Sequence, residues 1–119
     1  MPPTPKRVLL VEDEPLNSKA LTRYFQTFGI ELTSVPSTEI AFRVLAQQPP
    51  YHAIITDLLL PGMSGQEFAR RIRQPRLIAL SGDAIALRSA QLFDVKLRKP
   101  CPPDILLGAV LGEEPGDEG

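Results

Sequence analysis

The stretch Tyr51–Gly65, YHAIITDLLLPGMSG, decides the fold. Its apolar run Ala53-Ile54-Ile55 leads to one carboxylate, Asp57, and Pro61 and Gly65 mark the turn that follows. A strand that is apolar on both faces is typical of the interior of a parallel sheet covered by helices. Open sheets of this kind carry their chemistry at the carboxyl ends of their strands. The stretch therefore predicts a buried strand with Asp57 in a reactive position.

The size and composition of the chain are those of one globular domain. It has 119 residues, an ordinary apolar fraction of 43% and a net charge of −1, so neither disorder nor nucleic-acid binding is indicated. No apolar run approaches the length of a membrane span. The single cysteine, Cys101, excludes an internal disulfide, and the cytoplasm is therefore the expected location.

Strand and helix patterns alternate along the chain five times. The predicted strands cover residues 6–11, 30–35, 53–57, 76–80 and 93–97. The helix starts are marked by Pro15, Ser37, the pair Ser64 and Glu67, Ser81 or Asp83, and Pro102-Pro103. Such alternation predicts an α/β fold, with a five-stranded parallel sheet in the order 2-1-3-4-5 and helices on both faces. The fourth helix, from Ala84 to about Ala90, is expected to be short.

The helix patterns also predict which side chains face the sheet. The inward positions of the first helix, which Gly29 ends, are Leu16, Ala20, Leu21, Tyr24, Phe25 and Phe28, and those of the last helix are Ile105, Leu106 and Val110. Residues 6–111 are predicted to form the domain, residues 1–5 a loose arm, and residues 112–119 a disordered acidic tail.

Polar side chains stand where four of the five predicted strands end. Glu12 and Asp13 follow the first strand, Asp57 ends the third, Ser81 the fourth, and Lys99 follows the fifth. In the predicted strand order these ends meet at one rim. Three carboxylates this close repel one another, and Mg²⁺, which prefers oxygen ligands, relieves that repulsion. A lysine and a hydroxyl at the same rim suit a phosphoryl group, so phosphoryl transfer onto a carboxylate is the predicted chemistry.

These residues resemble the response-regulator receiver domain of two-component signalling. The family has an acidic pair after the first strand, an aspartate at the end of the third, Pro and Gly after it, Ser or Thr after the fourth, and Lys-Pro after the fifth. Here the pattern reads Glu12-Asp13, Asp57 with Pro61 and Gly65, Ser81, and Lys99-Pro100. The resemblance covers nearly the whole chain.

The resemblance implies a role for each of the acids. Asp57 would be the nucleophile that a histidine kinase or a histidine phosphotransfer protein phosphorylates. Glu12, Asp13 and Asp57, together with the backbone carbonyl of Leu59, would hold Mg²⁺.

The resemblance also assigns the remaining site residues and the output. Lys99 would pair with Asp57 and then with a phosphoryl oxygen, and Ser81 would hydrogen-bond the phosphoryl group. The chain would not be an enzyme, since it would assist only its own phosphorylation and dephosphorylation. It would act through a separate downstream protein, without binding nucleic acid or membrane directly.

One position departs from the family pattern. Receivers usually have an aromatic residue three positions before the lysine of Lys-Pro, and its rotation reports phosphorylation. Here that residue is Lys96. A lysine loses hydration or its proton on burial, so the usual aromatic switch is not expected. The neighbouring fourth helix lies on the face that receivers use to dimerise or to hold an output domain. Whether this chain forms a homodimer is left open by the sequence.

Two alternative functions fit parts of the sequence. The first is a degenerate receiver that docks partners without phosphorylation, which Lys96 favours and the complete set of acid, hydroxyl and lysine opposes. The second is a Mg²⁺-dependent phosphatase of the haloacid-dehalogenase type, which needs a second aspartate where Leu59 stands.

Two charge clusters also have ordinary explanations. Glu12 to Glu14 could simply favour the positive end of a helix. The cations Arg70, Arg71, Arg73 and Arg76 suit a solvated helix end, and a docking role for them stays open.

Overall fold

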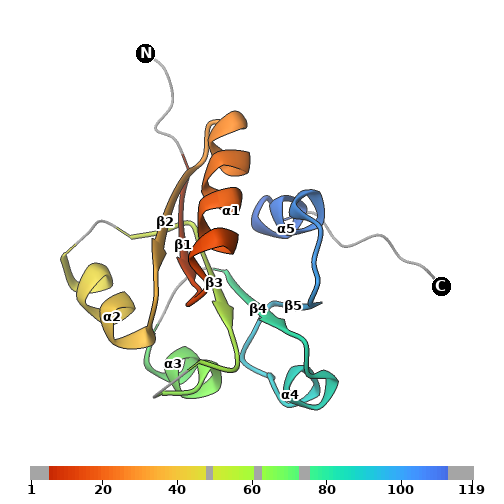
Figure 1. Cartoon of the computed structure of the whole chain (residues 1–119). Helices are drawn as coiled ribbons and strands as arrows, with labels where there is room; N and C mark the ends of the chain where they lie inside the picture. Colours follow the sequence, from red (N-terminus) through yellow and green to blue (C-terminus); the bar gives the residue numbers. More distant parts are fainter. Residues whose placement is uncertain (1–5, 48–49, 61–62, 73–75, 113–119) are drawn as a thin grey trace.

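The computed structural model describes residues 6–47, 50–60, 63–72 and 76–112. One parallel sheet runs through it in the order β2-β1-β3-β4-β5, and a helix follows each strand (Figure 1). The strands are β1 (Arg7–Val11), β2 (Glu31–Val35), β3 (Ala53–Asp57), β4 (Leu77–Ser81) and β5 (Val95–Arg98). The helices are α1 (Pro15–Thr27), α2 (Thr38–Gln47), α3 (Gly65–Arg71), α4 (Ala84–Arg88) and α5 (Pro103–Val110). The predicted α/β fold and strand order are confirmed.

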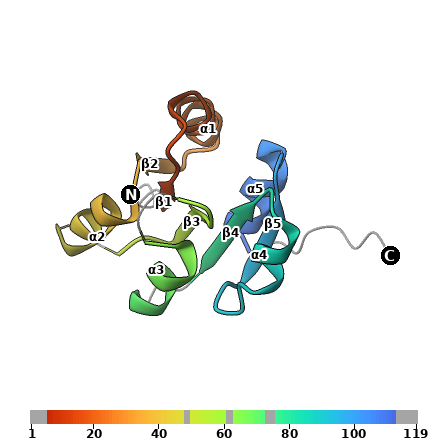
Figure 2. The same cartoon turned by 60° about the horizontal axis from the view of Figure 1, so that its bottom comes forward.

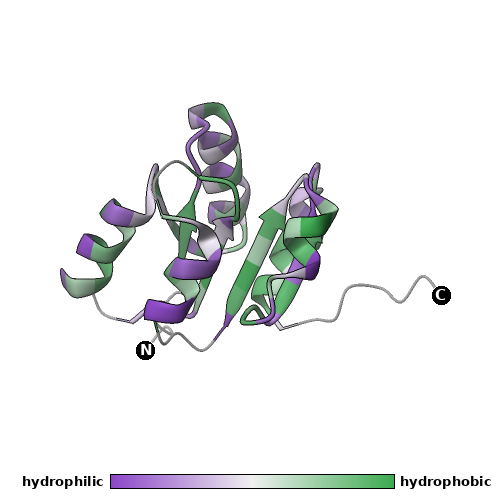
Figure 3. Cartoon of the chain, turned by 90° about the horizontal axis from the view of Figure 1, so that it is seen from below, coloured by the Kyte–Doolittle hydropathy of each residue, from purple (hydrophilic) through white to green (hydrophobic). Residues whose placement is uncertain are grey.

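Helices cover both faces of the sheet, as expected. Phe25 of α1 and Leu106 of α5 belong to the apolar cluster on one face. Ala41 of α2, Phe68 of α3 and Leu87 of α4 belong to the cluster on the other face (Figure 2). Figure 3 shows the same layering in colour, with hydrophobic strands in the middle and hydrophilic patches on the helices outside them. The sheet is therefore the shared wall of two apolar cores.

Short polar side chains start several of the helices, as their sequence patterns predict. The Ser37 hydroxyl accepts the N–H of Ile40 at 3.2 Å, and the Ser64 hydroxyl accepts the N–H of Glu67 at 3.1 Å. Both oxygens of Glu67 bond arginines instead of returning to the helix start, so only half of the predicted capping box forms. Gly29 ends α1 in the left-handed region with φ 75°.

Several residues predicted to face the sheet are exposed. They are Leu16 (76% exposed), Ala20, Phe28 and Ile105. Helix α1 has 13 residues, or about 20 Å, whereas its neighbouring strands have five residues, or about 17 Å. A helix longer than its sheet leaves residues at its ends exposed: Leu16 lies in the first turn, and Phe28, the C-cap, keeps the Tyr24 ring as a neighbour, with the ring centres 5.1 Å apart. Leu21, Tyr24 and Phe25 of α1 pack on the core, as predicted.

The element boundaries near β5 are also corrected. The predicted fifth strand starts at Phe93, but β5 begins at Val95, and α4 ends at Arg88, short of Ala90. A short fourth helix is nevertheless confirmed. Lys96 lies exposed on β5 opposite Ala79 of β4.

Some predictions fall on parts of the chain that the structure does not describe. They are the arm at residues 1–5, the tail beyond Gly112, and the turn residue Pro61. Among the described residues, no helix has the length and apolarity needed to cross a membrane.

The far end of the sheet from Asp57 contains His52, the only histidine. The backbone N–H of Arg7 donates to its Nδ1 at 3.0 Å, so His52 joins two strand starts. Nearby, the Arg7 guanidinium carbon lies 4.5 Å from the centre of the Tyr51 ring. The Tyr51 hydroxyl is buried and has no hydrogen-bond partner among the residues that the structure describes.

We expect Tyr51→Phe to leave the free energy of unfolding unchanged or to raise it by up to about 1 kcal/mol, because a buried hydroxyl without a partner costs desolvation energy. The aromatic ring and its contact with Arg7 remain in the variant. Urea denaturation followed by circular dichroism measures the change. A loss of more than about 1 kcal/mol would mean that the hydroxyl has a partner after all.

Candidate functional site

The carboxyl ends of β1, β3, β4 and β5 bring four predicted site residues to one rim. Asp57 is the last residue of β3 and pairs in register with Leu80, which places Ser81 at the end of the adjacent strand. Glu12 directly follows β1, and Lys99 directly follows β5. Asp57 is 8% exposed and Glu12 only 5%, whereas Ser81 is fully buried. The sheet order alone therefore collects two acids, a hydroxyl and an amine.

Lys99 connects the two buried acids. Its ammonium Nζ lies 2.6 Å from Asp57 Oδ2 and 3.3 Å from Glu12 Oε1. Burial by itself lowers the pKa of Lys99, but the hydrogen bond and charge of Asp57, and then those of Glu12, raise that pKa above its ordinary value. Lys99 is therefore held as a cation against two carboxylates.

Backbone N–H groups fix the remaining oxygens of the site. Asp57 Oδ1 accepts the N–H of Leu59 at 3.0 Å, and Glu12 Oε2 accepts the N–H of Glu14 at 3.1 Å. The Ser81 hydroxyl oxygen accepts the N–H of Asp83 at 3.0 Å. Each functional side chain is thus held by the loop that follows its own strand, so the loops set the geometry of the site.

The three acids after β1 divide their roles. Glu14 caps α1, since its carboxylate accepts the N–H of Leu16 at 3.3 Å, and this matches the ordinary explanation for an acid at a helix start. Glu12 turns inward to Lys99, and Asp13 is exposed at the mouth of the site. Only Glu12 therefore contacts the other polar residues of the rim.

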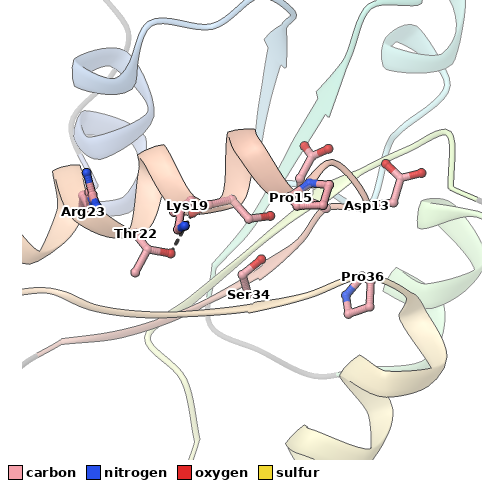
Figure 4. A pocket seen from close by; sticks show the side chains of 9 residues that line it. Asp13, Pro15, Lys19, Thr22, Arg23, Ser34 and Pro36 are labelled. Carbon is pink, nitrogen blue, oxygen red and sulfur yellow. Dashed lines mark hydrogen bonds between the residues drawn. The ribbon is translucent and has the colours of Figure 1, made fainter.

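The donor set suits Mg²⁺ chemically, because carboxylate oxygens keep lone pairs beyond those in hydrogen bonds. Within the described residues, no three acids, histidines or cysteines converge closely enough to hold an ion as they stand. An open hollow of about 530 Å³ borders Glu12 and Asp13 and runs between α1 and β2 past Lys19 and Ser34 (Figure 4). Water and a hydrated cation could reach the two acids from this side.

Gly65 packs against the backbone of the predicted nucleophile. A Cβ added to Gly65 would lie 2.9 Å from Leu58 Cδ2, 3.0 Å from Leu58 Cα and 3.1 Å from the carbonyl oxygen of Asp57. Two of these three neighbours are backbone atoms that cannot move alone. The glycine therefore allows α3 to start directly against the end of β3.

Two further contacts at the rim were not predicted from the sequence. The buried hydroxyl of Thr56 bonds the carbonyl oxygen of Asp57 at 3.0 Å, and Arg98 Nε donates to the carbonyl oxygen of Gly82 at 3.3 Å. The signal for Thr56 was one polar residue inside an apolar run. The sequence does not indicate the Arg98 contact, since an exposed cation beside Lys99 is most simply interpreted as a solvated charge.

Comparison with known proteins identifies the family. A family model described as the response regulator receiver domain matches residues 8–110. The chain therefore belongs to the response regulator receiver domain family, and with it to the phosphoaccepting signalling modules of two-component systems.

Curated relatives contain this domain as one part of a longer chain. Sensor protein TorS of Escherichia coli strain K12 is 29% identical over 108 residues, which are 84% of this chain and 12% of TorS. Stress response regulator protein 1 of Meyerozyma guilliermondii is 36% identical over 91 residues, which are 71% of this chain and 40% of that protein. The chain spans less than half the length of either relative.

Solved structures show the same fold. A response regulator receiver protein from Pseudomonas putida is 30% identical with a TM-score of 0.80, covering 93% of this chain and 99% of that one. Response regulator protein TrrA from Thermotoga maritima, solved in complex with Mg²⁺ and BeF, is 27% identical with a TM-score of 0.80, covering 90% of this chain and 97% of that one.

We expect Lys99→Met to lower the free energy of unfolding at neutral pH by about 1–3 kcal/mol, because two nearly buried carboxylates then face each other without a cation. The folded pKa of Lys99 is raised, so its stabilisation is complete below the pKa of an unfolded lysine, about 10.4, and is lost as pH rises through the folded pKa. Urea denaturation from about pH 7 to about pH 11 should show the wild-type advantage shrinking only above about pH 10.

The control for this experiment is Lys96→Met, which removes an exposed lysine from the neighbouring strand. Its effect should stay within about 0.5 kcal/mol across the same pH range. An equal loss in both variants would contradict the ion-pair assignment.

We expect Gly65→Ala to cost about 1–3 kcal/mol of stability, because the added methyl group meets backbone that must shift. Gly82→Ala is the matched control, since nothing lies within 4 Å of a Cβ at that position. Denaturation midpoints of the two variants give the comparison. Equal stability of both variants would show that α3 does not press on the Asp57 backbone.

Proposed function

We propose that this chain is a phosphoaccepting switch in a histidine-to-aspartate phosphorelay, with Asp57 as the acceptor. The observation that supports this most is the contact of Asp57 with Lys99 at 2.6 Å, beside the buried hydroxyl of Ser81. A resting ion pair holds the carboxylate in position, and the same lysine can then pair with a phosphoryl oxygen. The donor would be a phosphohistidine on a histidine kinase or on a histidine phosphotransfer protein.

The transfer would use side chains that stand at the rim, together with Mg²⁺. An oxygen of Asp57 forms a bond to phosphorus while the phosphorus–nitrogen bond of the phosphohistidine breaks. The electron pair stays on the imidazole nitrogen, which takes a proton from water. Lys99 balances the charge that accumulates on the phosphoryl oxygens, and Ser81 can donate its hydroxyl hydrogen to one of them.

Mg²⁺ is part of the proposal. Glu12, Asp13 and Asp57 would hold it, with the backbone carbonyl of Leu59. When bound, the ion offsets the repulsion between the incoming phosphoryl group and these acids. The exposed position of Asp13 fits a ligand that closes on the ion only when the ion arrives. Leu59 is also exposed, so its carbonyl belongs to a loop in contact with solvent.

Output through a separate protein is also part of the proposal. Lys96, in place of the family's aromatic residue, is already exposed on β5, so an aromatic rotation cannot carry the signal here. A cytoplasmic location agrees with a donor that is a histidine kinase and with a single unpaired cysteine.

The test is the intact mass of the protein after incubation with Mg²⁺ and a small acyl phosphate. We expect a gain of one phosphoryl group that Asp57→Asn and chelation of Mg²⁺ both abolish. Asp83→Asn is the control, because Asp83 caps α4 through the N–H groups of Ile85 and Ala86 and stands outside the acceptor set. No gain in a folded protein would refute the switch and favour a receiver that docks partners without phosphorylation.

A further inference from the structure

A small polar hollow separates α3 from the connection between α4 and β5. Its volume is about 240 Å³, and it is lined by Gln66 and Arg70 of α3 and by Ser89, Gln91, Leu92 and Phe93. Gln66 and Arg70 stand four residues apart, so they share one face of α3. Figure 2 shows α3 and α4 on the same side of the sheet, below β3 and β4. The lining thus offers one guanidinium, two amides and a hydroxyl.

The charge balance around the hollow is positive. Arg70, Arg71 and Arg88 are exposed cations on the two helices, and Glu67 is the acid among them. The pKa of Glu67 is lowered first by the hydrogen bond from Arg71, while the bond from Arg70 is the smallest cause. Arg70 contacts Glu67 Oε1 at 2.7 Å through Nη1 alone, and Arg71 contacts Oε2 at 3.0 Å, so the other N–H groups of the Arg70 guanidinium can still donate to an outside anion. Asp94, beyond Phe93, accepts the N–H of Leu77 at 2.7 Å and belongs to the start of β4.

Exposed apolar side chains flank the same hollow. Leu92 lines it and is 54% exposed, and Ile85, which is 67% exposed, lies one helical turn before Ser89. Large apolar side chains gathered beside a polar hollow are a mark of interaction sites. The volume is below the range of about 300–1,000 Å³ that small-molecule pockets occupy, so a single side chain of a protein partner fits better than a free ligand.

We propose that this α3–α4 face docks a partner protein through an acidic side chain, which Arg70 and the amides of Gln66 and Gln91 receive, while apolar neighbours of that acid cover Leu92 and Ile85. The partner chemistry is a glutamate or aspartate next to leucine-like residues. The role of this face rests on the proposed function, in which the output passes through a separate partner protein.

The position of the face links it to the rim. Helix α3 starts at Gly65, against the Asp57 backbone, and α4 starts at Ala84, three residues after Ser81. One wall of the hollow is therefore a helix that starts against the Asp57 backbone, and the other is the connection that follows the helix starting near Ser81.

A titration of the isotope-labelled protein, followed by nuclear magnetic resonance, tests the face directly. The probe is the acetylated and amidated peptide Ser-Leu-Glu-Ile-Leu-Ser, and the matched probe has glutamine in place of glutamate. We expect saturable shifts at the amides of Gln66, Arg70, Gln91 and Leu92, and at least about five-fold weaker binding of the glutamine peptide. Equal binding of both peptides, shifts elsewhere, or no saturable shifts would overturn the proposal.

Two arginine variants make the test specific. Arg70→Ala and Arg71→Ala each remove one exposed partner of Glu67 from the same helix, so their costs in stability are similar. Arg70→Ala should weaken the glutamate peptide by about five-fold or more, and Arg71→Ala by less than about two-fold. Leu92→Ser should also weaken binding, whereas Leu111→Ser, which changes an exposed leucine at the end of α5, should not. Equal effects of the two arginine variants would overturn the proposal.

The titration uses the unmodified chain, so its result is independent of phosphorylation. Failure of peptide binding in a protein that gains the phosphoryl group overturns the docking face alone. Peptide binding in a protein that gains none supports the face and refutes the phosphorelay.

Discussion

The ammonium group of Lys99, held between two nearly buried carboxylates, is the interaction on which the rest of the site depends. Its partners lie 42 and 87 positions away in the sequence, at the ends of β3 and β1. The parallel sheet, in which β3 lies beside β1 and β5 follows β4, brings these three strand ends to one edge. A cation in this position offsets the repulsion between acids that the fold forces close to one another. The strand order therefore places these charged groups together, and their attraction in turn stabilises the strand order.

Much of this arrangement could be predicted because it depends on where strands stop. Two apolar runs end at polar residues, one at Asp57 and the other at Ser81. Each run indicates both the position of a strand and the side chain at its carboxyl end. Strand–helix alternation then leaves few sheet orders, since crossovers of parallel strands are right-handed. The rim follows from these two constraints without any knowledge of side-chain packing. This is why Glu12, Asp57, Ser81 and Lys99 could be placed together from the sequence.

What could not be predicted depends on relative lengths and angles in space. Leu16 and Phe28 follow the helical period but lie at the ends of α1, where it extends past the sheet. Ile105 was also predicted to face the sheet, but the helical period does not give the width of the buried face of α5. The second contact of Lys99, with Glu12, depends on a side-chain direction that no spacing encodes. Arg70 is a similar case. Its sequence neighbours suggest a solvated helix end, and only the approach of the α4–β5 connection gives it a polar hollow.

Strand β5 has a consequence for how the molecule associates. It lies at the edge of the sheet, where Lys96 and Arg98 are exposed in alternation with the buried Val95 and Leu97. The open side of an edge strand can template another strand, and charged side chains on it oppose that pairing. At high concentration the β5 edge should therefore resist pairing with a strand of another copy of the chain.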